Sequence, residues 1–64
     1  MKAVDEYRIA IALDERFVDA WNRLWHCLRD LGRIEEAVAA ARKFYALDPT
    51  HPDALDALEL LEGR

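Results

Sequence analysis

Three side chains of this sequence, His26, Cys27 and His51, are of the types that bind metals or act as nucleophile and base. A zinc site needs several such ligands close together, and a catalytic thiol needs a base within hydrogen-bond reach. His26 and Cys27 are adjacent, so on a helix their side chains point about 100° apart and do not chelate one ion. Cys27 stands beside apolar residues and has no second cysteine to pair with, so we expect a buried, unreactive thiol. We therefore predict no catalytic residue and no metal site.

Acidic residues recur at every third position near the end of the chain. They are Asp53, Asp56, Glu59 and Glu62. Carboxylates at close spacing bind hard cations. The same spacing also places them along one face of a helix, where water solvates them. The second interpretation is the commoner one, and it requires no bound ion.

The chain has 64 residues and a formal net charge of −4, with 53% hydrophobic and 34% charged residues. Proteins that bind nucleic acids or anionic membranes need a basic footprint, so the charge argues against both classes. No apolar run approaches the roughly 20 residues that span a bilayer, and the chain does not begin with a signal pattern. Gly32 and Gly63 are too few and too far apart for a phosphate-binding loop. We expect a single cytoplasmic domain over residues 1–64 without a cofactor.

Helix-breaking residues divide the chain into four segments. The breaks are at residues 14–17, at Gly32 and at residues 48–52, where Pro49 and Pro52 stand. Glycine suits the left-handed position after a helix, and proline suits the first turn of the next one. The segments 2–13, 18–31, 34–47 and 52–62 have no glycine or proline in their interior and are predicted to be helices. Apolar residues at helical spacing support two of them. These are Trp21, Leu24, Trp25, Leu28 and Leu31 in the second, and Ala37, Val38, Ala41, Phe44 and Tyr45 in the third. The aromatic residues among them are expected in the core.

The sequence repeats itself with a period of 34 residues. Nine of the thirty residue pairs that can be compared at this offset are identical, including Arg8 with Arg42 and Leu24 with Leu58. A period of about 20–50 residues is typical of repeat arrays, in which each unit packs on its neighbours. Arrays of this kind usually bind other chains on an extended surface, so the period indicates binding rather than catalysis.

The motif within this period resembles the tetratricopeptide repeat. Trp21 and Leu24 match its W-x2-L opening, Gly32 fits the turn between its two helices, Ala37 fits the small residue of the second helix, and Leu47-Asp48-Pro49 matches its close. The resemblance implies an all-α fold of antiparallel helix pairs, a fragment of an α-α superhelix. Residues 18–47 form one complete pair. Residues 2–13 resemble the second, or B-type, helix of a preceding unit, and residues 52–62 resemble the first, or A-type, helix of a following one.

The chain departs from the family pattern at several positions. Trp25 and Phe44 stand where the family has small residues, and Ala41 stands where it has an aromatic one. Because a large residue facing a small one conserves core volume, we expect Trp25 to fill the space that Ala41 leaves. Glu15 stands where the earlier unit would carry proline.

The resemblance also implies a partner, since A-type helices of this family line a groove that binds protein or peptide segments. The positions carried over to this chain are Asp19, Asn22, His26, Arg29, Asp30, Asp53, Asp56 and Leu60. Asn22 and Arg23 match positions that grip a terminal carboxylate in some relatives, but Asp53 and Asp56 supply negative charge where that clamp is basic. We therefore expect a basic or apolar segment as ligand. The alternative is that these polar residues are simply solvated.

A second interpretation is self-association. The first and last helices lack the partner that they would have within their own repeat, and neither has the polar outer face of a capping helix. Copies could then meet as a homo-oligomer: a ring, an exchanged dimer or a filament. The residues expected in such contacts are Ile9, Ile11, Leu55, Leu58 and Leu61. The same features fit a repeat that was excised from a longer array or engineered. An enzymatic function is not expected.

Overall fold

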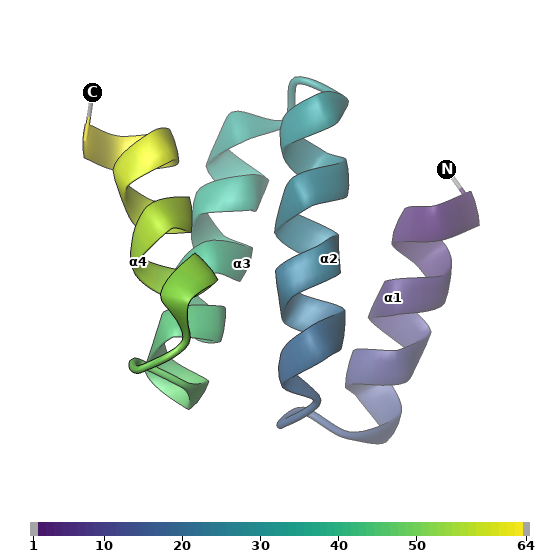
Figure 1. Cartoon of the computed structure of the whole chain (residues 1–64). Helices are drawn as coiled ribbons and strands as arrows, with labels where there is room; N and C mark the ends of the chain where they lie inside the picture. Colours follow the sequence, from purple (N-terminus) through teal and green to yellow (C-terminus); the bar gives the residue numbers. More distant parts are fainter. Residues whose placement is uncertain (1, 64) are drawn as a thin grey trace.

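The computed structural model describes residues 2–63, and all of its regular elements are helical. They are α1 (Lys2–Leu13), α2 (Val18–Asp30), α3 (Ile34–Leu47) and α4 (Pro52–Leu58), which continues into the π-helical turn η1 (Glu59–Gly63). The four helices lie side by side in a slab of 30 × 25 × 14 Å, and each runs antiparallel to the next (Figure 1). The all-α prediction is confirmed, with no strand among residues 2–63.

The turn between α2 and α3 explains why α2 ends at Asp30, one residue earlier than predicted. Gly32 has φ = +82°, a left-handed conformation that costs glycine nothing. Its N–H donates to the carbonyl of Arg29 at 2.9 Å, and the N–H of Arg33 donates to the carbonyl of Leu28 at 2.9 Å. These two bonds form a Schellman motif, which satisfies carbonyls at the end of α2 and reverses the chain.

The start of α4 uses both residues that the sequence places there. Pro52 occupies the first turn, where its missing N–H is not needed. His51 caps the helix, since its Nδ1 accepts a hydrogen bond of 3.1 Å from the N–H of Asp53. The His51 ring also packs edge-on against Phe44, with centroids 5.0 Å apart. His51 therefore has a structural role at the joint between α3 and α4.

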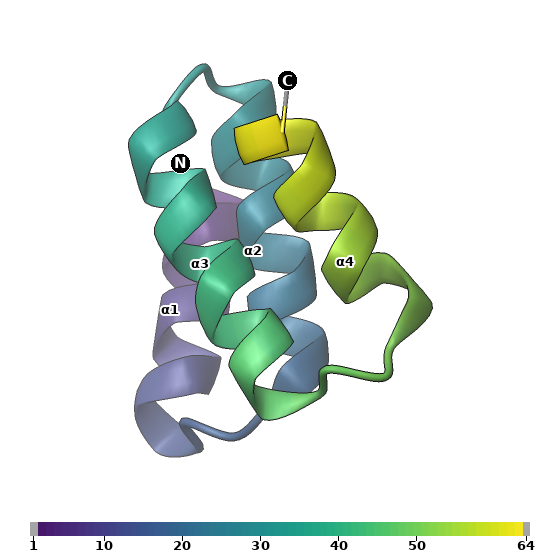
Figure 2. The ribbon, with the colours of Figure 1, turned by 90° about the vertical axis from the view of Figure 1, so that its left-hand side faces the viewer.

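The last segment was predicted to be one helix over 52–62, but its end is wider than an α-helix. Hydrogen bonding changes to the π pattern from Glu59 onward. This turn packs Leu61 against the core, and it lets Glu62 accept a 2.8 Å bond from Nε of Arg42 on α3. Figure 2 shows α4 beside α3, with both helices in front of α2.

The core lies between α2 and α3, with α1 and α4 packed on either side. Trp25, Leu28 and Phe44 are its largest fully buried side chains. Alanines complete it: Ala20, Ala37, Ala40, Ala41, Ala54 and Ala57 are all buried. Tyr45, which was expected in the core, lies outside it with 38% exposure, and Leu31 of the apolar stripe is 39% exposed. Both stand near the ends of their helices, where no neighbouring element covers them. None of the described helices has the length and apolar character needed to cross a membrane.

Trp25 is predicted to contribute more to stability than any residue at the surface. Truncating a buried aromatic to alanine costs about 3–5 kcal/mol, and a domain of this size has roughly 3–10 kcal/mol in total. We expect Trp25→Ala to lower the free energy of unfolding by at least about 3 kcal/mol in urea melts followed by circular dichroism. The matched control is Tyr45→Ala, which removes an exposed aromatic and should cost well under 1 kcal/mol. A loss below about 1 kcal/mol for Trp25→Ala would contradict its role in filling the core.

Candidate functional site

The residues predicted to line a groove on the A-type helices lie on α2 and α4. Asp19, Asp30, Asp53 and Asp56 are exposed, whereas Asn22, His26 and Arg29 are half-buried. Leu60, in η1, is 66% exposed. The predicted face thus has exposed acidic residues on one part and half-buried residues, which contact the rest of the protein, on another.

Trp25 holds the three half-buried residues of this face. Its indole N–H donates a 2.9 Å hydrogen bond to Oδ1 of Asn22. The ring of His26 stacks on it with centroids 3.9 Å apart and planes 25° apart, and the guanidinium carbon of Arg29 lies 5.3 Å from its centroid. Asn22, His26 and Arg29 therefore contact a buried aromatic side chain, which gives them a structural role whether or not a ligand binds.

The acidic residues of the same face are largely free of internal partners. Asp30 lies 3.4 Å from Arg29 on the surface, and such exposed pairs contribute little. Within residues 2–63 no ion pair engages the carboxylates of Asp19, Asp53 or Asp56. These three carboxylates leave a negative surface over α2 and α4.

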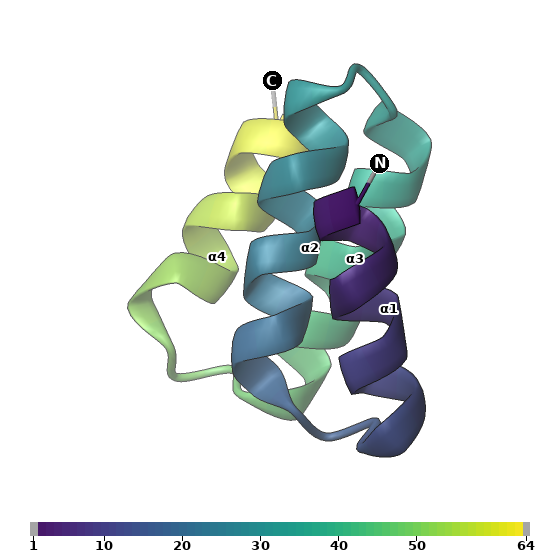
Figure 3. The ribbon, with the colours of Figure 1, turned by 90° about the vertical axis from the view of Figure 1, so that its right-hand side faces the viewer.

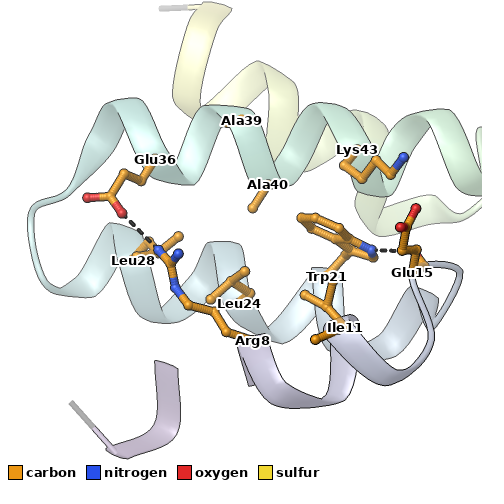
Figure 4. Close-up of a pocket in the computed structure, with 11 residues that line it drawn as sticks. Arg8, Ile11, Glu15, Trp21, Leu24, Leu28, Glu36, Ala39, Ala40 and Lys43 are labelled. Carbon is orange, nitrogen blue, oxygen red and sulfur yellow. Dashed lines mark hydrogen bonds and ion pairs between the residues drawn. The ribbon is translucent and has the colours of Figure 1, made fainter. Parts of the chain in front are cut away.

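A separate hollow of about 790 Å³ lies between α1, α2 and α3 (Figure 4). We call it the α1–α3 groove. Its lining residues are Arg8, Ile11, Ala12, Glu15, Trp21, Leu24, Leu28, Glu36, Ala39, Ala40 and Lys43. Most of them are apolar, and its volume lies within the range of about 300–1,000 Å³ that is usual for ligand pockets.

Charged pairs lie at the two ends of the α1–α3 groove. At one end Arg8 of α1 reaches across to Glu36 of α3, with Nη2 and Oε1 2.9 Å apart. At the other end stand Glu15 and Lys43, whose charged groups form no ion pair within the described residues. The floor at that end is Trp21, whose indole N–H donates a 2.8 Å bond to the carbonyl of Glu15 (Figure 4). One end is therefore neutralised and the other offers two free charges.

Sequence reasoning missed this groove. It assigned Trp21 and Leu24 to the core, and Leu24 is indeed buried, but Trp21 is only partly buried and faces the hollow. The groove exists because α1 and α3 both pack on α2 without packing on each other. The available signal was the small residues Ala12 and Ala39, which leave the space between the two helices empty.

The residues predicted for self-association fall into two groups. Ile9 is 60% and Leu55 is 52% exposed, so both are accessible. The other three, Ile11, Leu58 and Leu61, are half-buried and pack against the chain's own core. Leu13, which was not in the predicted set, is 84% exposed. The accessible apolar surface of α1 is therefore Ile9 with Leu13.

The residues considered for chemistry are dispersed. Among residues 2–63 no group of three or more His, Cys, Asp or Glu side chains is placed to hold a metal ion. Cys27 is a free cysteine that is half-buried rather than fully buried as expected, because it lies at the edge of the apolar stripe of α2. It packs against the core.

Comparison with known proteins gives one informative similarity. No protein-family profile matches the chain, and no solved structure matches it. Over 49 residues the chain is 39% identical to the small glutamine-rich tetratricopeptide repeat-containing protein 2 of Mycosarcoma maydis. The similar region covers 77% of this chain and 14% of that protein. The chain thus spans about a seventh of the length of this relative.

The Arg8–Glu36 ion pair is predicted to position the groove rather than stabilise the fold. Both side chains are about half exposed, at 51% and 50%, and exposed pairs are worth about 0.2–1 kcal/mol. We expect a coupling energy below about 1 kcal/mol from a double-mutant cycle of Arg8→Ala and Glu36→Ala in urea melts, falling further in 1 M salt. A coupling well above this range would make the pair a structural clamp instead.

Proposed function

We propose that the chain is a repeat unit of tetratricopeptide type that binds a segment of another protein. Three observations support this: the similarity to a tetratricopeptide repeat-containing protein, the 34-residue internal period and the antiparallel packing of successive helices (Figure 1). Repeat units of this kind present surfaces on which partners lie. No enzymatic role is part of the proposal.

The α1–α3 groove is the surface that the geometry favours, and its apolar floor is the observation that carries the proposal. Two helices flank it and a third closes it from below, which is the arrangement that receives an amphipathic helix. Such a helix would place apolar side chains over Trp21 and Leu24, both of which line the groove. Its own charged residues would lie level with Glu15 and Lys43 at the open end.

A groove occupant is predicted to change the fluorescence of Trp21. The probe is a synthetic amphipathic helical peptide with leucines at positions i, i+3, i+4 and i+7 and with Lys and Glu elsewhere. Binding should shift tryptophan emission, because the indole of Trp21 would lose water, and Trp21→Phe should abolish the shift while Trp25 remains. Ala39→Arg fills the groove from an exposed position of α3 and should weaken binding at least about tenfold, or 1.4 kcal/mol.

The matched control for Ala39→Arg is Ala46→Arg. Ala46 is exposed on the same helix and does not line the groove, so this variant adds the same charge elsewhere and should bind as the parent does. Equal loss in both variants would show that charge, not occupancy of the groove, decides binding. Unchanged binding in Ala39→Arg would show that the peptide does not bind in the α1–α3 groove.

The acidic face of α2 and α4 is a second candidate surface, and it is favoured by the unpaired Asp19, Asp53 and Asp56. A basic segment would be its ligand, in keeping with the chain's net charge of −4. We expect Asp19→Lys with Asp56→Lys to abolish the salt-sensitive binding of a lysine-rich peptide measured by anisotropy. Glu35→Lys, at an exposed acid on α3, should reduce it only slightly. Equal effects in both variants would mean that only net charge attracts the peptide.

Self-association through the outer helices remains the alternative function, whether the repeat is natural, excised or engineered. The exposed apolar residues Ile9 and Leu13 on α1 and Leu55 on α4 favour it. It predicts a mass that rises with concentration, whereas binding of a foreign segment predicts a free groove on a single chain.

A further inference from the structure

The outer face of α1 carries a short apolar stripe that no part of the described chain covers. Val4, Tyr7 and Ile11 turn inward, since Val4 is buried and the other two pack on the core. Ile9 and Leu13 stand two residues before and after Ile11, so they lie about 160° around the helix axis from it. They are 60% and 84% exposed. Figure 3, which views the molecule from the side of α1, shows α1 at the edge of the slab, nearest the viewer.

Charges of opposite sign flank this stripe at equal separations in the sequence. Glu6 stands three residues before Ile9, and Arg16 stands three residues after Leu13, in the turn just beyond the end of α1. Both are exposed, and within residues 2–63 neither side chain takes part in an ion pair. The sequence of the stripe is therefore acid, apolar, apolar, base.

We propose that α1 binds α1 of a second copy of this chain in an antiparallel, two-fold symmetric pair. A two-fold contact joins the same surface on both subunits, so each residue meets its counterpart in reverse order. With residue 11 at the centre, Ile9 faces Leu13 of the other copy, and Glu6 comes level with Arg16 of the other copy. The stripe is complementary to itself only in this orientation, because a parallel pair would place Glu6 against Glu6 and Arg16 against Arg16.

The second copy fits this face better than a foreign partner does, because its charge pattern matches twice. Two ion pairs and four apolar side chains meet in one contact. The surface that these few side chains bury is smaller than the roughly 800 Å² per partner of a stable dimer. We therefore expect a reversible pair with a dissociation constant on the order of 0.1 mM. The contact rests on the self-association alternative and leaves the α1–α3 groove open, so its failure would not affect the proposal of peptide binding.

Sedimentation equilibrium of the whole chain, up to about 1 mM, tests the pair through charge exchange. The parent chain should reach a mass of two chains and no more. Glu6→Arg and Arg16→Glu change net charge in opposite directions, yet each should weaken the pair about tenfold, because attraction becomes repulsion at both ends. The combined Glu6→Arg/Arg16→Glu variant restores complementarity and should return to within about threefold of the parent.

Three controls keep this test decisive. Leu13→Asp alters a residue that is 84% exposed, so it should abolish association while circular dichroism shows an unchanged helix content. Leu55→Glu lies on α4 and should have no effect. In a Cys27→Ala background, Ile9→Cys chains should form disulfides with Leu13→Cys chains faster than with other Ile9→Cys chains.

Four outcomes would overturn the proposal. They are a monomeric parent at all concentrations, growth beyond two chains, loss of association in Leu55→Glu, and no recovery in the double charge variant.

Discussion

The contact between large side chains on α2 and small ones on α3 is the constraint on which the rest of the structure depends. Trp25 and Leu28 of α2 are fully buried, in one cluster with Ala37, Ala40, Ala41 and Phe44 of α3. Each alanine lets the helix axes approach, and each large residue fills the volume that results. The outer helices then pack on this pair, α4 with Ala54 and Ala57 and α1 with Val4.

This concentration of the core in one helix pair explains which features could be predicted from the sequence. Helix ends were predictable because they depend on local chemistry: Gly32 takes φ > 0 and Pro52 begins α4. The change to π geometry after Leu58 was not, since it depends on how the last turn meets α3. The exposure of Tyr45 was also missed, because helical spacing identifies a face but not how far a neighbouring helix covers it.

The candidate site shows the same division. The resemblance implied that Asn22, His26 and Arg29 of α2 face a binding groove, and in the structure all three contact Trp25. The α1–α3 groove could not be predicted, because it arises from the space between two helices that the Arg8–Glu36 ion pair joins across it. The residue pattern within each helix does not predict how far apart α1 and α3 lie.

The 34-residue period explains why exposed apolar residues lie on the outer helices. At this offset α1 corresponds to α3 and α2 to α4, but size is exchanged at key positions: Trp25 corresponds to Glu59, and Phe44 corresponds to Ala10. The order of helices repeats, but the large core residues do not. The outer helices α1 and α4 therefore bury less of their own surface than α2 and α3 do. Their remaining apolar residues, such as Leu13 at 84% and Leu60 at 66% exposure, are not needed to fold the central pair. Because exposed apolar residues on a helix gain free energy only when another surface covers them, α1 and α4 can acquire partners in addition to the α1–α3 groove without disturbing the core.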